Sequence, residues 1–215
     1  MSSRVRCSAL AAAVASAAFA TSARAQISVE LGATIGYYSP MGSFERTSIY
    51  SVSLPKGPGD LSGPALGGEL RLWVVPRVGF AFTGSTVSTE AGGGSTPNGY
   101  HPPTSARIST GAAQLLFRVT GGESRARVWL SAGGGFVKHG GDEYVQFGKP
   151  TNAAGVFGVG SAIRIAGGLN AELGVTTMIY SVNMSAATLA FDTPISERGK
   201  QTDMLLRTGL SYTIH

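Results

Sequence analysis

The chain has 215 residues, which is enough for one domain or at most two small ones. Only 13% of its residues are charged, and it holds 31 glycines and 10 prolines, so it is too apolar for a disordered chain and lacks the period-three glycine of collagen. The formal charge of +5 suggests a nucleic-acid partner only until the N-terminal segment is taken into account.

Residues 1–25 are predicted to be a cleaved signal peptide. Arg4 and Arg6 form a positive n-region, an apolar stretch spans residues 10–20, and residues 23–25, ARA, resemble a cleavage site. The apolar stretch is shorter than the ~18 residues that a membrane-spanning helix needs. Cleavage removes three arginines and no acid, so the formal charge falls from +5 to +2 and we expect no nucleic-acid partner.

The remaining chain, residues 26–215, is predicted to be a single domain without cysteine. Cys7 is the only cysteine and lies in the removed segment, so disulfides, thiolate ligands and a cysteine nucleophile are excluded. No later stretch is apolar for long enough to form a transmembrane helix, and hardly any shows the i, i+3, i+4 spacing of an amphipathic helix.

Apolar residues alternate instead with small or polar ones, which is the pattern of half-buried β-strands. In the first run, Leu31 and Ile35 alternate with Glu30, Gly32 and Thr34. The eight runs, in chain order, are residues 27–36, 66–72, 78–82, 115–119, 128–136, 157–165, 169–179 and 204–214.

The connections between the runs alternate between long and short. The long ones are roughly residues 39–62, 88–106, 139–149 and 184–200, and the short ones are residues 76–77, 121–124 and 167–168. A chain that passes up and down through a slab has this pattern if one side requires tight turns and the other allows loops. A β-sandwich with Greek-key crossings gives no reason for it.

The polar positions of the runs indicate a narrow interior, because they are mostly Gly, Ser, Thr and Ala, with single charges and no lysine. The lumen of an eight-stranded barrel is just wide enough for side chains to fill. The large apolar residues then face lipid, where a closed barrel satisfies every backbone hydrogen bond. The charges that share the inward register, and that we expect to pair across the lumen, are Glu30, Glu69, Arg71, Arg118, Arg164, Glu172, Asp203 and Arg207.

Aromatic residues near strand ends fit the interfacial girdles of such a barrel. Tyr37, Phe136 and Tyr212 are examples on the outward register. Trp73 is the exception, because its register places it with Glu69 and Arg71.

With these features the chain resembles the small eight-stranded outer-membrane β-barrels of the OmpA/OmpX kind, over all of residues 26–215. The resemblance implies an eight-stranded antiparallel up-and-down transmembrane β-barrel in the outer membrane of a Gram-negative-type bacterium. It also implies outer-membrane lipid and the outer-membrane assembly machinery as partners. Such proteins usually end in an aromatic residue, commonly Phe, whereas this chain has Tyr212 and Ile214 in the outward register and ends in His215.

An enzymatic or metal-binding role is not expected. None of His101, His139 and His215 lies at mid-strand next to an outward-facing serine that it could activate. His139, Asp142 and Glu143 lie close together in sequence and could hold a cation, but ligand type alone constrains little, and a solvated loop is the simpler interpretation. We therefore predict no catalytic residue, no metal and no cofactor.

Three hypotheses about function follow. The favoured one is a non-enzymatic barrel with a filled lumen and long surface loops, acting in envelope integrity, adhesion or binding of an extracellular ligand. The second is a small channel or transporter that passes a small or apolar solute through the barrel or a lateral opening. The third is a soluble exported carrier of the lipocalin type, in which the apolar face points inward.

Overall fold

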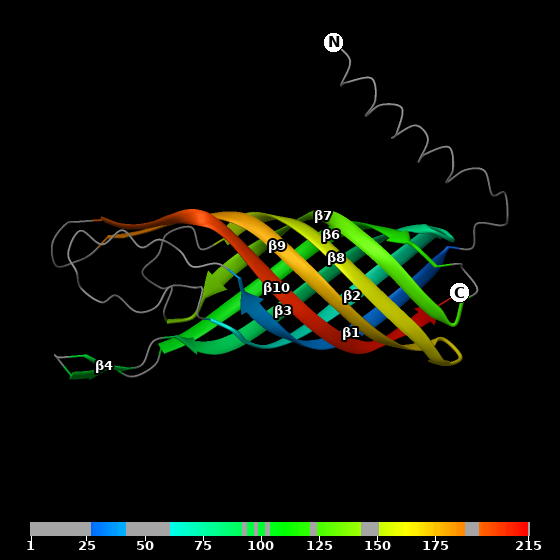
Figure 1. Cartoon of the computed structure of the whole chain (residues 1–215), viewed down its shortest axis with the longest axis horizontal. Helices are drawn as coiled ribbons and strands as arrows, with labels where there is room; N and C mark the ends of the chain where they lie inside the picture. The colour runs from blue at the N-terminus through cyan, green and yellow to red at the C-terminus, as the bar shows by residue number, and fades with distance from the viewer. Residues whose placement is uncertain are drawn as a thin grey trace, which may run out of the picture.

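The computed structural model describes residues 27–41, 61–91, 94–96, 99–101, 104–120, 124–142, 151–187 and 194–214, and its main element is a closed antiparallel β-barrel (Figure 1). Each barrel strand pairs with the next one in the chain, and β1 closes the barrel against β10, with Val29 opposite Ile214. This confirms the predicted fold class. The barrel strands are β1 Ser28–Pro40, β2 Gly63–Val75, β3 Val78–Ala91, β6 Thr104–Arg118, β7 Ala126–Gly140, β8 Thr151–Ala166, β9 Leu169–Ala187 and β10 Pro194–Ile214.

A two-stranded hairpin, β4 Gly94–Thr96 and β5 Gly99–His101, stands apart from the barrel sheet between β3 and β6. It lies beyond the barrel at the end opposite the tight turns (Figure 1). Within the described part of the chain, no helix is long and apolar enough to cross a bilayer.

The predicted alternation of tight turns and long connections is confirmed. β2 and β3 are joined by residues 76–77, and β8 and β9 by residues 167–168. Gly167 has φ +52°, a left-handed backbone that a two-residue hairpin turn requires and that glycine adopts without a steric penalty. We call the end with these turns the turn side of the barrel and the opposite end the loop side.

The strands extend further toward the loop side than the runs of apolar residues. β3 continues to Ala91 and β9 to Ala187, and β10 already begins at Pro194, so the connections predicted at 88–106 and 184–200 are partly strand. These extensions are rich in Ser, Thr and Ala, because they lie beyond the apolar belt. Period-two hydrophobicity therefore does not reveal them. The predicted signal peptide lies outside the described residues.

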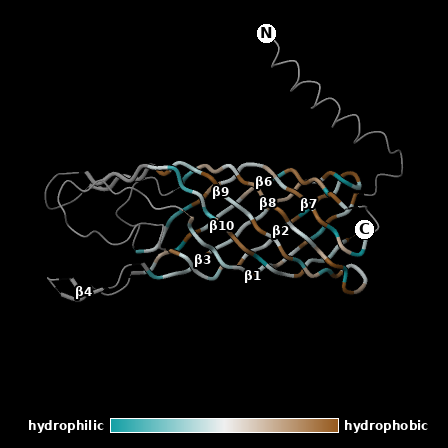
Figure 2. The backbone as a smooth tube through the Cα atoms, viewed as in Figure 1, coloured by the Kyte–Doolittle hydropathy of each residue, from teal (hydrophilic) through white to brown (hydrophobic). Residues whose placement is uncertain are grey.

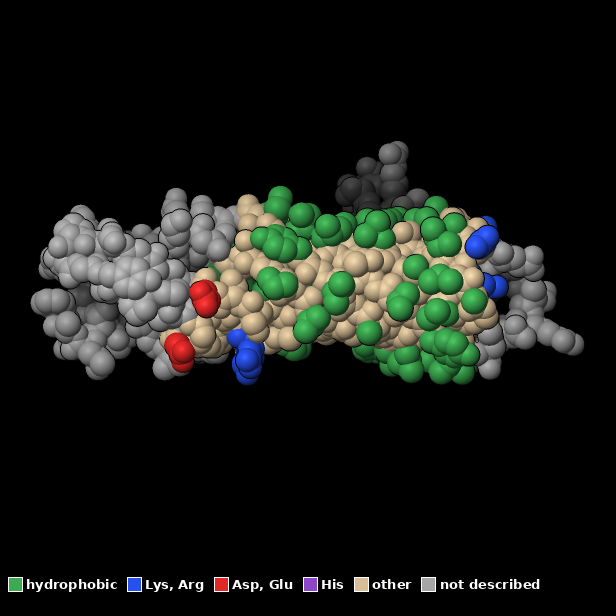
Figure 3. All heavy atoms as spheres, turned by 90° about the horizontal axis from the view of Figure 1, so that it is seen from below, with side chains coloured by type: hydrophobic (Ala, Val, Ile, Leu, Met, Phe, Trp, Pro, Cys, Tyr) green, Lys and Arg blue, Asp and Glu red, His purple; other side chains and the backbone are tan. Residues whose placement is uncertain are grey.

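The outer surface carries the large apolar side chains. Leu130 on β7 is 52% exposed, and its neighbours across the strands, Phe117 and Val159, are exposed as well. Figure 2 shows apolar and polar residues alternating along the strands, and in Figure 3 apolar side chains cover the barrel wall while the charged ones lie toward the two ends of the visible face. The register predicted from the sequence therefore places the apolar face outside.

Two clusters of buried side chains fill the interior, one at each end. The turn-side cluster contains Trp73, Ala81, Leu116, Trp129 and Ala162. The loop-side cluster includes Tyr38, Val87, Ile108, Val137, Val156, Met178, Tyr180 and Leu205. Trp73 is 2% exposed and faces inward, as its register predicts.

Candidate functional site: the lumen

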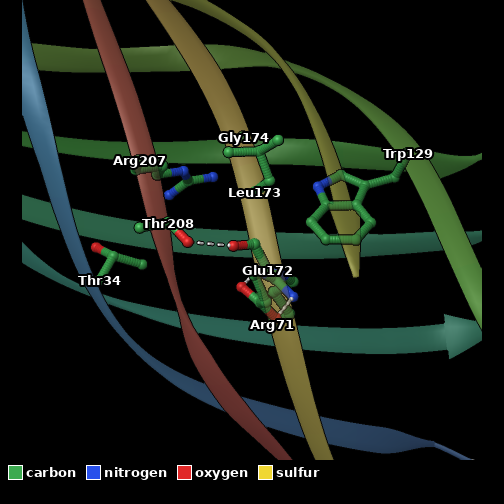
Figure 4. A pocket seen from close by; sticks show the side chains of 8 residues that line it. All are labelled: Thr34, Arg71, Trp129, Glu172, Leu173, Gly174, Arg207 and Thr208. Atoms are coloured by element: carbon green, nitrogen blue, oxygen red, sulfur yellow. Dashed lines mark hydrogen bonds and ion pairs between the residues drawn. The ribbon is translucent and has the colours of Figure 1, made fainter. Parts of the chain in front are cut away.

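Arg71 on β2 is the centre of a charged network in the turn-side half of the lumen. Its Nε donates to Glu69 Oε1 at 2.5 Å, and its Nη1 donates to Glu30 Oε2 at 3.0 Å and to Glu172 Oε1 at 2.6 Å. A further hydrogen bond joins Arg71 Nη2 to the second oxygen of Glu172. Figure 4 shows Arg71 and Glu172 next to each other inside the barrel. One guanidinium thus holds acids from β1, β2 and β9.

Two more arginines complete the network. Arg127 Nη1 on β7 donates to Glu30 Oε1, and Arg207 Nη1 on β10 lies 2.7 Å from Glu69 Oε2. The network therefore contains three carboxylates and three guanidiniums from five strands and crosses the lumen. Charges buried away from water are costly unless they are paired and hydrogen-bonded, and each of the three carboxylates is paired with a guanidinium and accepts at least one hydrogen bond.

Both tryptophans of the chain lie against arginines of this half. The Arg71 Cζ atom lies 4.3 Å from the ring centroid of Trp129, and the Arg118 Cζ atom lies 4.0 Å from that of Trp73. At these distances a guanidinium is attracted to the negative face of the indole ring. Cation–π contacts thus hold Arg71 and Arg118 in addition to the ion pairs of Arg71.

The structure brings together five of the residues predicted from the sequence to form a luminal network: Glu30, Glu69, Arg71, Glu172 and Arg207. Arg118 lies beside them, but none of the described acids forms an ion pair with it. Asp203 belongs to a separate cluster in the loop-side half.

The placement of Arg164 in the lumen is wrong. The register of β8 against β9 shifts between Arg164 and Ala166, and the backbone N–H of Arg164 donates to the carbonyl of Arg125 at the turn side. The Arg164 side chain is exposed at the end of the strand. Arg164 still pairs with the buried Asn170 and so keeps the inward parity, but it is the last regular pair before the shift, and its side chain reaches solvent at the end of the strand.

Arg127 is the member of the network that the sequence prediction missed. It shares the inward register of Trp129 and Ser131 on β7, and the same pattern would have identified it. What the pattern does not give is its partner, because Glu30 lies on β1, across the barrel.

Asp203 is fully buried in the loop-side half and accepts hydrogen bonds from three side chains. The donors are the hydroxyl groups of Tyr38 and Tyr180, the latter at 2.7 Å, and Nε2 of Gln201 at 2.8 Å. Around this group Val87, Ile108 and Val137 are completely buried. The loop-side half is therefore closed by packed side chains and by hydrogen bonds to a single carboxylate.

Two small cavities lie between and beside the two halves. One of about 20 Å³ is lined by hydroxyl side chains, among them Thr83, Ser85 and Thr110, together with Met178 and Arg207. The other, of about 10 Å³, is drawn in Figure 4 and touches Arg71, Glu172 and Arg207. Each has room for about one water molecule and not for an organic ligand.

The structure does not bring the histidines and the predicted cation ligands that it describes together at one site. His139 faces inward, buried, with its ring centroid 6.1 Å from that of Tyr180. Asp142 is exposed and accepts a hydrogen bond from Ser105, while Glu143 and His215 lie outside the described residues, and so does the side chain of His101. Among the residues that are described, no group of three or more His, Cys, Asp or Glu side chains is placed to hold a metal ion.

Solved structures of outer-membrane proteins have a similar barrel. The outer membrane protein OprG from Pseudomonas aeruginosa superposes with a TM-score of 0.61 at 9% identity, covering 87% of this chain and 96% of OprG. The outer membrane protein AlkL, solved in lipid bilayers, superposes with a TM-score of 0.56 at 13% identity, covering 91% of this chain and 94% of AlkL. The chain has the fold of the small outer-membrane β-barrels. Neither a family model nor a curated protein sequence matches it.

This outer-membrane barrel fold is also found in an enzyme. The outer membrane protease OmpT from Escherichia coli superposes with a TM-score of 0.51 at 12% identity, covering 92% of this chain and all of OmpT. At such identities the similarity shows the fold and does not assign a role.

Proposed function

We propose that the chain is a non-enzymatic outer-membrane barrel with a closed lumen, which serves as a scaffold for the long connections at its loop side. In this role it acts in envelope integrity, adhesion or binding of an extracellular ligand. The observation that carries the proposal is that two separate groups of side chains fill the lumen, one ionic and one mostly apolar, and that the two cavities beside them measure about 10 and 20 Å³.

The outer surface supports the location. Apolar side chains that are about half exposed occur on every barrel strand, among them Leu31, Leu66, Phe82 and Leu210. Such a surface needs an apolar environment, and the closed hydrogen-bonded sheet suits hydrocarbon. Export through the predicted signal peptide, residues 1–25, and insertion by the assembly machinery complete this proposal.

Fractionation tests the location. The mature protein, beginning at Gln26 by N-terminal sequencing, is expected in the outer-membrane fraction and to require detergent for extraction. Recovery of most of it as soluble periplasmic protein would contradict the proposal.

Planar bilayer recording tests the closed lumen. The unmodified barrel is expected to be silent or to show only brief, small openings, because ions would have to displace both groups of luminal side chains. A large, steady, ohmic conductance would overturn the scaffold proposal. A variant with Glu69, Arg71 and Glu172 replaced by Ala and Ile108 and Val137 replaced by Gly serves as the positive control, because it removes the central ion pairs of one half and packed volume from the other.

The burial of His139 supports a non-enzymatic role. Its ring lies inside the barrel at 1% exposure, so a substrate outside the barrel cannot reach it. Because the OmpT barrel is a protease, the fold alone does not decide this point. Assays of the purified barrel with peptide and phospholipid substrates are expected to show no turnover that depends on His101 or His139.

A second candidate is a small transporter, and the cavity between β9 and β10 favours it. Its lining includes the inward-facing Glu172 and Arg207 and also Leu173 and Thr208, which face outward. This cavity therefore borders side chains of both faces of the wall, next to Gly174. Faster entry of a small apolar solute into liposomes that contain the barrel, without ionic conductance, would favour a lateral route over the scaffold.

A further inference from the structure

Among the described residues, the turn-side half of the lumen contains one more positive charge than its acids balance. It holds the carboxylates of Glu30, Glu69 and Glu172. The guanidiniums of the same half are those of Arg71, Arg118, Arg127 and Arg207. Arg118 is the guanidinium for which the described residues provide no carboxylate. Its contact is the face of Trp73.

Arg118 and Arg127 also have buried N–H groups to spare. The two side chains are 6% and 5% exposed, and Arg118 Nε, Arg127 Nε and Arg127 Nη2 have no hydrogen-bond acceptor. Arg127 uses only Nη1, on Glu30. Buried donors are nearly always satisfied in native proteins, so a group of three on two neighbouring arginines indicates an acceptor other than the described side chains.

The strand register places these two arginines next to each other. Arg118 is opposite Trp129 in the β6–β7 pair, and Arg127 lies two residues before Trp129 on the same inward face. Such diagonal neighbours have Cβ atoms about 7 Å apart, and like charges there repel. An anion between them would accept their free N–H groups and remove the repulsion.

We propose that Arg118 and Arg127 form a binding site for a small monovalent anion, of halide size, at the turn-side mouth of the lumen. A single negative charge balances the single excess positive charge of this half. The site lies where β6 ends and β7 begins, so it is close to the solvent of the turn side. It goes beyond the scaffold role and does not depend on it.

The tryptophans make the site observable. Trp73 and Trp129 are the only two in the chain, both are nearly fully buried, and both lie on arginines of this half. The full mature barrel in detergent micelles is titrated with potassium iodide, with potassium fluoride holding the ionic strength constant. Collisional quenching of buried rings is weak and linear in iodide, whereas a bound iodide next to Trp73 gives a saturable loss of fluorescence. Chloride is expected to reverse this saturable part.

Arg118→Leu is the decisive variant, because it removes the excess charge and a free donor while retaining an apolar stem over Trp73. Loss of one charge-assisted hydrogen bond should weaken iodide binding roughly tenfold or more. Arg125→Leu is the matched control, because Arg125 is exposed on the same turn; it should leave the saturable quenching unchanged. Heat-modifiable gel migration reports whether each variant is folded, and Arg118→Lys, with weaker but measurable binding expected, replaces Arg118→Leu if that variant does not fold.

Three results would overturn the proposal. Quenching that is linear and equal in the unmodified barrel and in Arg118→Leu would mean that no anion binds. An equal loss of affinity in Arg125→Leu would mean that only the general positive potential of the turn side is at work. Saturable quenching that appears only in Glu123→Gln would mean that Glu123, which lies outside the described residues, occupies the site with its own carboxylate.

Discussion

The two halves of the lumen are closed by different physical means. In the turn-side half, Arg71 connects three acids from three strands, so the closure depends on mutual neutralisation of buried charges. In the loop-side half, the single carboxylate of Asp203 is held by neutral donors, and Val87 and Ile108 fill the remaining space. The ionic half fails when a charge loses its partner, while the packed half fails when volume is lost. Because the two lie in series, the loss of one should leave the barrel closed.

The largest expected effect is that of Arg71→Met. The substitution keeps much of the side-chain volume but leaves Glu172 without its guanidinium, and the other acids with one cation each. Breaking a buried charge network from one side costs about 3–5 kcal/mol of the free energy of unfolding. Urea unfolding of the barrel in lipid vesicles, followed by tryptophan fluorescence, measures this loss.

Arg77→Met is the control for that measurement, because Arg77 is exposed in the β2–β3 turn. Its effect should stay within about 0.5 kcal/mol, as for an ordinary surface residue. A similar small loss for Arg71→Met would show that water solvates the network, and the contrast between the two halves would then lose its basis.

The contrast between the halves requires that both groups of side chains face the lumen and that the apolar residues face lipid. Leu130→Arg places a charge in the apolar belt and should cost about 2–4 kcal/mol if it lies near the middle of the bilayer. Ser88→Arg, on the outward register of β3 near the loop side, should cost about 0–1 kcal/mol. Equal tolerance in vesicle unfolding would reverse the assignment of the two faces.

The barrel and the inward register were predictable because both depend on local periodicity. Alternation of Leu66, Leu70 and Leu72 with Glu69 and Arg71 already defines the two faces of β2, and the two-residue connections define its neighbours. The partners inside the lumen were not predictable in the same way. Whether Arg127 contacts Glu30 depends on the stagger of strands around the whole barrel, which no local pattern contains.

The positions of residues near strand ends were also not predictable from the sequence. Arg164 has the right parity for the lumen and pairs with the buried Asn170, but it lies at the turn-side end of β8, where its side chain is exposed. Asp203 also has the right parity, yet it is opposite Pro40 on one side and opposite Met178 on the other, and Met178 is six residues along β9 from Glu172. The alternation in a strand tells which face a residue is on, but not how far along the barrel axis it lies. The single luminal network predicted from the sequence is therefore two separate clusters in the structure.

Tyr38→Phe tests how the loop-side half is closed. It removes one of the three donors to Asp203 and should cost about 1.5–3 kcal/mol, since that hydrogen bond reaches a charged acceptor. Bilayer recordings should remain silent, because the packing of Val87 and Ile108 is unchanged. The control is Tyr37→Phe, whose exposed hydroxyl contacts Ser62 at 3.0 Å and whose loss should change stability by less than about 0.5 kcal/mol. Steady conductance in Tyr38→Phe would mean that the hydrogen bonds, and not the packing, close this half.

The smallest expected effect concerns two adjacent glycines of β7. A Cβ at Gly135, on the inward register, would lie 2.3 Å from the carbonyl oxygen of Gly111 and 3.0 Å from Cα and Cβ of Ala112 on β6, so the strand pair would have to shift. Overpacking of this kind should cost about 1–2 kcal/mol in Gly135→Ala. A Cβ at Gly134, on the outward register, meets only the carbonyl oxygen of Ala154 at 3.9 Å, so Gly134→Ala should be neutral or stabilise by up to about 1 kcal/mol, because alanine restricts the unfolded chain. Unfolding of the two variants in lipid vesicles measures the free energy change for an inward and an outward position of β7, at the level between the two halves of the lumen. A stable Gly135→Ala barrel would show that the strands can part at this level, which would favour a lumen able to open over the closed scaffold.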